Sequence, residues 1–456
     1  MFGKSSHEID MLHGPLLGPI LLFVIPSAIT SALQLLFHAA DVVVVGRYAG
    51  AGALAAVGAS TAVINLLVNI FAFGVSSGVN IILAREYAAE NYDTVNRALH
   101  SAISLAILVG VLFAGLGIGF APQILTAMQT PDDIFPSALI YLRIYLAGLP
   151  ALVVYNFGAA ALRAIGDTRR PMYYLFGTGI LNVLLNLFFV LVMHLGVAGV
   201  GIATSIANYA AVILVLRALY LEDSCLRLRF QSLRLEGDVL SEILQLGIPA
   251  AINSSMYGIT NVLVQSSVNS LGSTYIAGNA VAQNLEGFLC CIVYAFPAAA
   301  LSFVSQNAGA GMYRRVDRSL RTAIISGMII TFIAGAVMNL FSARLVGIYN
   351  QDPTVISVGV RRLHITFMTY FIEVWLNCVG SALRAMKHVQ IQMVISIVFI
   401  CCFRVFWLLT VFRIWHYYET IALIWPASWI VCLLVYAFVY PRIRSKYPKE
   451  DAVSPA

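Results

Sequence analysis

The sequence predicts an all-α polytopic membrane protein, with twelve transmembrane helices in two six-helix lobes related by an internal parallel repeat. Its 456 residues are 60% hydrophobic and only 11% charged, with a mean hydropathy of +0.87. A soluble protein would carry about 25% charged residues. The apolar runs are around 20 residues long, which is typical of transmembrane helices and not of barrel strands. Several runs also recur at one constant spacing, which indicates duplication.

Twelve apolar runs are long enough to cross a bilayer. They lie near residues 16–46, 53–83, 98–120, 138–162, 171–194, 197–220, 241–270, 275–305, 319–345, 358–383, 388–412 and 419–440. Pro26, Pro150, Pro249 and Pro297 fall inside these runs. They predict kinks or local unwinding, which membrane bundles tolerate where neighbouring groups satisfy the freed carbonyls.

The basic residues predict the orientation of the chain. With the N-terminus inside, 20 of the 27 Lys and Arg residues lie at cytoplasmic ends of spans, and Arg404 lies within a span. Positive residues concentrate on the cytoplasmic side, so we expect a multi-pass plasma-membrane protein with both termini in the cytoplasm. This distribution accounts for the net charge of +6 without nucleic-acid binding.

A shift of 221 residues aligns the two halves of the chain. It places Val95–Leu99 on Val316–Leu320 and Ala161–Ala164 on Ala382–Ala385. Six spans in each half make an even number, so each half begins and ends on the same side of the membrane. The halves are therefore expected to be parallel repeats.

The repeat predicts an N-terminal lobe at 1–220, a cytoplasmic linker at 221–240 and a C-terminal lobe at 241–456. The linker is rich in charges of both signs. Two lobes that rock about a shared site provide alternating access, so this organisation favours a transporter over a channel.

Three polar residues interrupt the first span. Gln34, His38 and Asp41 follow the spacing i, i+4 and i+7, which places them on one face of a helix. A carboxylate within a span costs about 2.5–3.5 kcal/mol on insertion scales. We interpret the stripe as the lining of a wet cavity that handles an ion or a proton. The alternative is an Asp that ends the span or forms a hydrogen bond inside the bundle.

Further polar residues occur within spans of the first lobe. They are Asn65 with Asn69, Tyr141, Asn156, Asn182 with Asn186, and Thr204 with Asn208. Around a single acid, the set favours a hydrated chamber for a cation or proton. Any one of these Asn residues could equally form an interhelical hydrogen bond, which is typically worth about 0.6 kcal/mol.

The second lobe has its own polar residues within spans. They include Tyr257, Gln283, Glu286, Glu373, Asn377 and Arg404. Glu286 and Glu373 are the other intramembrane acids, and Arg404 could neutralise one of them, with Glu373 the favoured partner. The pair would serve either structure or gating and drug binding.

The sequence argues against an enzyme or an ATP-driven pump. It contains no nucleophile–base pair, no P-loop and no cluster of metal ligands. The seven cysteines have no metal-binding or redox spacing. We therefore expect no cofactor beyond a coupling ion, H⁺ or Na⁺, and infer no obligate protein partner.

These residues resemble the multidrug and toxic compound extrusion (MATE) family along nearly the whole chain. The likeness rests on Gln34, Asp41 and Val45–Gly46 in the first span, on Ala161–Pro171 after the fourth, and on Ala382–Ala385 in the second lobe. Members are antiporters that export cationic and other amphipathic drugs, driven by inward proton or sodium gradients.

The resemblance implies that Asp41 is the coupling carboxylate, with Na⁺ as one ion it could bind. A first-lobe ion chamber would surround it, formed by Tyr141, Asn156, Asn182, Asn186 and Thr204. The remaining candidates for substrate binding or gating are Gln34, His38, Asn65, Asn69, Tyr257, Gln283, Glu286, Glu373, Asn377 and Arg404.

This sequence departs from the family pattern at two places. Many relatives have a second acid where Asn186 stands, and one branch has an acid on the seventh span, where this chain has Asn253–Ser255. Glu373 does match that branch's acid on the tenth span. The choice between H⁺ and Na⁺ therefore stays open.

The alternative function is a flippase for lipid-linked precursors, which needs a cationic central cavity. We expect Arg404 to be the only convincing intramembrane cation, which weighs against it.

Overall fold

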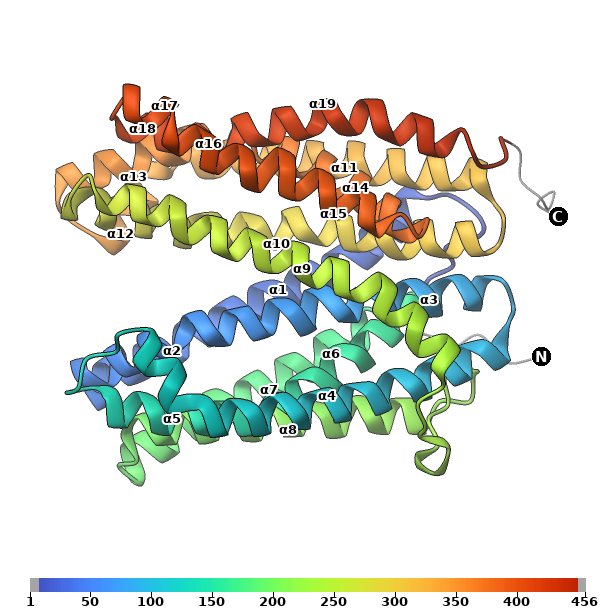
Figure 1. The fold of residues 1–456 in the computed structure, drawn as a ribbon, viewed down its shortest axis with the longest axis horizontal. Helices are drawn as coiled ribbons and strands as arrows, with labels where there is room; N and C mark the ends of the chain where they lie inside the picture. Colours follow the sequence, from blue (N-terminus) through green and yellow to red (C-terminus); the bar gives the residue numbers. More distant parts are fainter. Residues whose placement is uncertain (1–7, 450–456) are drawn as a thin grey trace. The chain divides into compact units, whose positions relative to one another are not determined.

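The computed structural model describes residues 8–449, and every regular element in that range is a helix. Residues 1–7, which include Lys4 of the topology count, and residues 450–456 lie outside the description. The first half of the chain forms α1 (Leu17–Val44), η1 (Val45–Ala49), α2 (Ala51–Val68), η2 (Asn69–Val75), α3 (Ser76–Ala88), α4 (Tyr92–Ala127), α5 (Phe135–Ala147), α6 (Leu149–Ala164), α7 (Arg169–Leu187), η3 (Phe188–Val192), α8 (Gly196–Tyr220) and η4 (Phe230–Ser232). The order can be followed by colour in Figure 1.

The second half forms α9 (Gly237–Asn269), α10 (Ser273–Gly309), α11 (Tyr313–Leu340), α12 (Ser342–Tyr349), α13 (Pro353–Thr366), α14 (Tyr370–Ala385), α15 (Val389–Ser396), η5 (Ile397–Cys402), α16 (Phe403–Leu409), α17 (Val411–Ile414), α18 (Tyr418–Ala422) and α19 (Ile424–Arg444). The segments η1, η2, η3 and η5 are π-helical turns that continue apolar helices. Such turns are common at functional sites.

In the described residues, nine helical segments are long and apolar enough to cross a membrane, or ten if the bent pair α5–α6 counts as one span. These ten correspond to ten of the predicted spans. The other two predictions, 241–270 and 358–383, also fall on helices. Neither is counted as long and apolar enough to cross a membrane. Polar side chains lower the hydropathy of α9, and the predicted span 358–383 is divided between α13, with 14 residues, and α14, with 16.

Contacts divide the chain into two compact units. Unit 1 contains residues up to 9 and 29–251, and unit 2 contains residues 10–28 and 252 onward. The helices α1 and α9 therefore each contribute to both units. These contact units differ from the lobes expected at 1–220 and 241–456, because the first part of each leading helix packs with the other repeat. The assignment of 1–220 and 241–456 as moving lobes stays a prediction.

Unit 1 holds the linker 221–240 against the start of α4. The side-chain amide of Asn96 donates to the carbonyls of Cys225 and Arg227 at 3.1 and 3.2 Å. The backbone N–H of Arg229 donates to His100 Nε2 at 3.0 Å, and Arg97 pairs with Glu236 and Asp238. The linker is therefore a fixed part of unit 1.

Unit 2 holds the segment before α1 against α10 and α11. Asn307, near the end of α10, donates to the carbonyl of Met11 at 3.2 Å. Arg315, in the first turn of α11, donates to the carbonyls of Met11, His13 and Gly14 at 2.8–3.1 Å. Because α11 aligns with α4 under the 221-residue shift, each unit fixes a segment that precedes a leading helix.

Within unit 2, α10 packs against α11, α13 and α14 (Figure 1). Within unit 1, α6 packs against α3, α4 and α8, and α7 packs against α8. These inner helices bury many small residues, such as Ala159–Ala161 on α6. Small side chains let helix backbones approach closely in membrane bundles.

Candidate functional site

The second half of α1 carries Asp41 against α7 in unit 1. Gly179 of α7 makes this approach possible, because a Cβ added there would overlap the ring of Phe37. Asn182 and Asn186 follow Gly179 at intervals of three and four residues, so they share its face of α7. The same packing therefore brings both amides toward α1.

A chain of hydrogen bonds joins Asp41 to α7 and α8. The Asn186 amide donates to Asp41 Oδ1 and also to Asn182 Oδ1, at 3.2 Å for the second bond. Asn182 in turn donates to Thr204 Oγ1 at 3.3 Å, and the Thr204 hydroxyl reaches the Asp41 carboxylate. Asn182 and Asn186 are buried, while Asp41 and Thr204 are half-buried.

This arrangement leaves the Asp41 carboxylate without a cationic partner among the described residues. The Oδ1 atom of Asn186 is also buried without a hydrogen-bond partner in the same part of the chain. An unpaired buried acceptor typically costs about 1–3 kcal/mol. The site therefore combines an uncompensated carboxylate with a nearby oxygen that can still accept a hydrogen bond or bind a cation.

Two tyrosines of α5 lie within electrostatic reach of Asp41. Tyr141 is buried, as is expected of a residue in the chamber, and its ring lies 6.2 Å from that of Tyr145. Tyr145 is absent from the set chosen from the sequence. Its position one helical turn after Tyr141 was the available signal.

In the described structure, the other predicted first-lobe residues form no hydrogen bond with Asp41. Asn156 is buried but donates to the carbonyl of Leu152 on its own helix at 2.8 Å. Gln34, His38 and Asn65 are exposed, and Asn69 is half-buried where η2 begins. The role of Asn156 in the ion chamber stays a prediction. So do the roles of Gln34, His38, Asn65 and Asn69 in substrate binding or gating.

Unit 2 contains a buried ion pair that sequence reasoning missed. Arg362 of α13 donates to both oxygens of Glu286 of α10, at 2.7 and 2.8 Å, and both residues are buried. The sequence placed Arg362 at the loop end of a span and made Arg404 the only intramembrane cation, and that placement is wrong. The helix α13 already begins at Pro353, which carries Arg362 more than two turns inward to a compensating carboxylate.

Polar and aromatic groups enclose this pair. Glu286 also accepts from the hydroxyls of Thr366 at 2.7 Å and Tyr370 at 3.3 Å. Asn279 accepts from Arg362 and from the Tyr418 hydroxyl, and the Arg362 guanidinium lies 4.1 Å from the centre of the Trp425 ring. Every oxygen of the Glu286 carboxylate is thus occupied by side chains of this chain.

Glu373 has a different environment from Glu286. It is buried and accepts from the Tyr294 hydroxyl at 3.3 Å and from the Asn377 amide at 3.5 Å. In the described structure no guanidinium forms a hydrogen bond with it. Glu373 is therefore the second intramembrane acid without a paired cation, after Asp41.

Arg404 is held by neutral groups in unit 2. It donates to Ser428 at 3.1 Å and to Asn261 at 3.4 Å. The rings of Tyr257 and Trp425 lie 6.0 and 5.9 Å from its guanidinium. The structure thus forms no ion pair between Arg404 and Glu373, although the two charges interact through space. Gln283 is exposed on α10.

Among the described residues, no three His, Cys, Asp or Glu side chains form a group that could hold a metal ion. The fold and its polar interior define a polytopic helical membrane protein with carboxylates inside its helical bundle. The model of the MatE family matches residues 26–188 and 249–407, one match in each half of the chain. The chain therefore belongs to the multidrug and toxic compound extrusion (MATE) family of transporters.

Named relatives cover nearly the same length. The chain is 27% identical over 438 residues to the probable multidrug resistance protein YoeA of Bacillus subtilis, covering 92% of this chain and 93% of the relative. It is 26% identical to the probable multidrug resistance protein YpnP of the same organism, covering 85% and 87%. A solved multidrug resistance MATE family transporter in an outward-facing conformation has the same fold, with a TM-score of 0.88, 19% identity, and coverage of 97% and 99%.

Proposed function

We propose that this protein is a secondary active exporter, which exchanges amphipathic and cationic drugs for H⁺ or Na⁺ at Asp41. The main support is the Asp41 carboxylate, which is hydrogen-bonded by Asn186 and has no cation beside it in the described structure. Charged groups without partners are costly in a membrane and usually serve transport. Membership of a transporter family, which is not an enzyme class, agrees with this function.

The coupling step follows from the two states of the carboxylate. Ionised, Asp41 accepts the hydrogen bonds of Asn186 and Thr204. Neutralised by a proton, the carboxyl group becomes a donor, and the unpaired Oδ1 of Asn186 is the nearest available acceptor. The hydrogen bonds between α1 and α7 then reverse direction. This change favours a different arrangement of α1 and thereby alternates access.

The same atoms could bind Na⁺. Carboxylate, amide and hydroxyl oxygens are suitable ligands for a hard cation, and Asp41, Asn186 and Thr204 supply one of each. A second carboxylate would increase the attraction for Na⁺, but this chamber has only one in the described structure. We therefore favour the proton as the coupling ion.

For the drug, Glu373 is the most suitable charged group in unit 2. Glu286 is neutralised by Arg362, whereas Glu373 is hydrogen-bonded only by neutral groups among the described residues. The Tyr294 hydroxyl bonds to Glu373, and its ring offers a face for an organic cation.

The excess of Lys and Arg at one set of helix ends supports placing both termini in the cytoplasm.

A flippase for lipid-linked pyrophosphates is not favoured. Such a site needs free positive charge, but Arg362 is fully engaged by Glu286 and Arg404 lies near Glu373. The multidrug names of the relatives also favour drugs as substrates.

The test is drug efflux from proteoliposomes under separately imposed pH and sodium gradients. We expect efflux driven by the pH gradient, with the D41N variant folded but inactive. D93N, at the exposed first turn of α4, removes a carboxylate of the same kind and should retain efflux. Efflux in D41N at the wild-type rate would reject Asp41 as the coupling group, and efflux driven only by a sodium gradient would replace H⁺ by Na⁺.

A further inference from the structure

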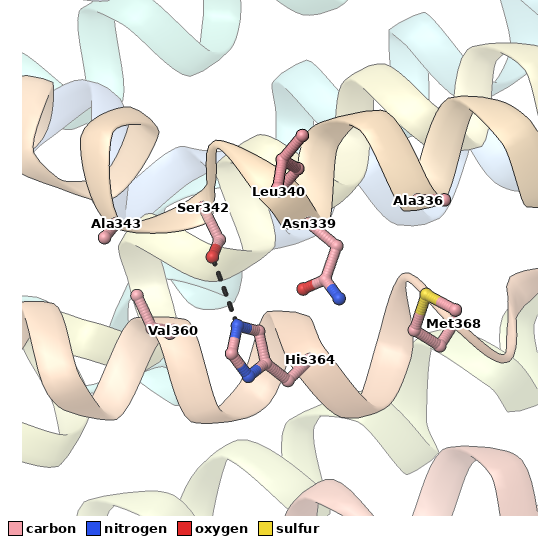
Figure 2. A pocket seen from close by; sticks show the side chains of 8 residues that line it. All are labelled: Ala336, Asn339, Leu340, Ser342, Ala343, Val360, His364 and Met368. Atoms are coloured by element: carbon pink, nitrogen blue, oxygen red, sulfur yellow. Dashed lines mark hydrogen bonds between the residues drawn. The ribbon is translucent and has the colours of Figure 1, made fainter.

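A pocket in unit 2 lies apart from the buried acids. It lies where α11 ends, is bounded by α11, α12 and α13, and has a volume of about 590 Å³. Figure 2 shows the side chains that line it. Its lining residues are Ala336, Asn339, Leu340, Ser342, Ala343, Val360, His364 and Met368. Asn339, Ser342 and His364 are the polar ones, so the pocket has an apolar wall and a small polar end.

Asn339 is unsatisfied within this pocket. Ser342 and His364 bond to each other, with 3.3 Å between Oγ and Nε2. The Oδ1 atom of Asn339, in contrast, is buried and has no hydrogen-bond partner in the described structure. Figure 2 shows its amide between Ser342 and Met368, directed toward the pocket. Because a buried amide needs partners, this side chain indicates a polar ligand.

The pocket opens beside a surface that suits acyl chains. On α11, Ile333, Val337 and Leu340 are exposed, and Leu340 is 80% exposed. In a membrane protein such a face contacts lipid tails. The apolar run ends at Leu340, and α12 begins with Ser342 and carries the exposed Arg344. Polar and basic residues at the end of a span lie at the depth of lipid headgroups.

The corresponding place in unit 1 has different side chains. A shift of 221 residues places Asn339 on Ile118 and His364 on Arg143. In unit 1, the Arg143 guanidinium donates to the carbonyl of Ile118 at 3.4 Å and so bridges α5 and α4. In unit 2 the shorter His364 bonds to Ser342, and an amide replaces the isoleucine. The two repeats therefore differ here in chemistry: an arginine bridges α4 and α5 in unit 1, where an amide and a histidine line the pocket in unit 2.

We propose that this pocket binds the headgroup of a membrane phospholipid. The phosphate accepts hydrogen bonds from the amide of Asn339 and from His364, with Arg344 supplying positive charge. The acyl chains lie along the exposed face of α11. Free phosphate has the same polar chemistry but lacks the tails, so the apolar wall selects a lipid.

The test uses the full-length protein, purified in detergent and stripped of lipid. Native mass spectrometry measures binding of dioleoylphosphatidylglycerol, and hydrogen exchange reports protection of α12. Wild-type protein should bind one added dioleoylphosphatidylglycerol molecule, which protects residues 342–349. In the N339L/H364L variant, lipid affinity should fall about tenfold, and in R344Q about fivefold. R143L, at the equivalent place in unit 1, is the matched control and should bind as wild type does.

Dioleoylglycerol, which lacks the phosphate, and inorganic phosphate, which lacks the tails, complete the experiment. Neither should protect α12 at the concentration at which the phospholipid does. Equal lipid affinity in wild type, N339L/H364L and R344Q would overturn the proposal. Equal protection by dioleoylglycerol would also overturn it by reducing the site to an apolar contact. Protection by inorganic phosphate alone would identify a free anion as the ligand. Because R344Q leaves the pocket wall intact, misfolding of the double variant would still leave a decisive measurement.

Discussion

Arg362 of α13 and Glu286 of α10 form a bidentate ion pair within unit 2, with N–O distances of 2.7 and 2.8 Å. The pair lies just before the break between α13 and α14, where Tyr370 also bonds to Glu286. It therefore fixes the position of the helix that carries Glu373. Breaking it should affect both stability and the geometry of the second acid.

We predict that R362M strongly destabilises the protein. Removing one partner leaves Glu286 charged and buried, which typically costs about 3–5 kcal/mol. The double variant R362M/E286L should recover part of this loss, because it leaves no uncompensated charge. Equilibrium unfolding in mixed micelles measures both effects.

R361M provides the matched control for this prediction. Arg361 is adjacent in sequence but pairs with Glu419 at the exposed surface, at 2.9 Å. Exposed ion pairs contribute about 0–1 kcal/mol, so R361M should change stability little. If R362M and R361M behaved alike, the buried pair would have no special role in stability.

We predict that G179A impairs both folding and efflux. A Cβ at residue 179 would overlap the Phe37 ring, so α1 must move away from α7, at a typical cost of about 1–3 kcal/mol. G177A, on the same helix, is the control, because a Cβ there meets no atom within 4 Å. Adding F37A to G179A should restore efflux in proteoliposomes. Wild-type efflux in G179A alone would show that the α1–α7 approach is not needed.

A third prediction concerns the selectivity of the ion site. N186D places a second carboxylate beside Asp41, where the wild-type amide donates a hydrogen bond. Two negative groups attract Na⁺ more strongly than one, so efflux in N186D should respond more to a sodium gradient than wild-type efflux does. N156D, at a position that bonds within its own helix, should not change the response. An unchanged sodium response in N186D would separate Asn186 from ion selection.

A fourth prediction concerns pH and the linker. The backbone N–H of Val239 and then the Arg97 guanidinium hold the pKa of Asp238 below its usual value. A lowered pKa in the folded state stabilises the fold above the unfolded-state pKa of about 3.9. This contribution is lost as the pH falls through the folded value. The protection of residues 234–240 against hydrogen exchange, corrected for the intrinsic exchange rate at each pH, should therefore stay constant down to about pH 4 and decrease below it.

The D238N variant tests the origin of this acid response. Without the carboxylate, the loss of protection at low pH should become smaller. High salt should also weaken the ion pair between Asp238 and Arg97 in the wild-type protein, because both side chains are partly exposed and salt screens their charges. An identical acid response in D238N would assign it to other groups, such as Glu236.

Much of the fold could be predicted from the sequence because apolar length and periodicity depend only on local residues. The duplication could also be predicted from the sequence, by the 221-residue shift. The two family matches, at 26–188 and 249–407, lie in the two halves that this shift aligns. The contact units could not be predicted in the same way. The first part of α1 packs with residues more than 200 positions away, and no local sequence pattern predicts which half of the chain it contacts.

The candidate site was predictable where spacing carried the information. Asn182 and Asn186 lie one turn apart on α7, and the structure places both in the chain that reaches Asp41. Arg362 was misplaced because a charged residue near a span end resembles a loop residue until its partner is known. Glu286 lies 76 positions away, so only the packing of α10 against α13 reveals the pair.

The shared membership of α1 and α9 bears on the origin of the molecule. Each contact unit is completed by a helical segment encoded in the opposite repeat, with residues 10–28 in one unit and residues up to 251 in the other. A single-copy ancestor could have built a whole bundle only by exchanging its leading helix with a sister molecule. Gene fusion would then have joined two partners that each supplied a helical segment to the other, so either half expressed alone today should need the other half to be present in order to fold.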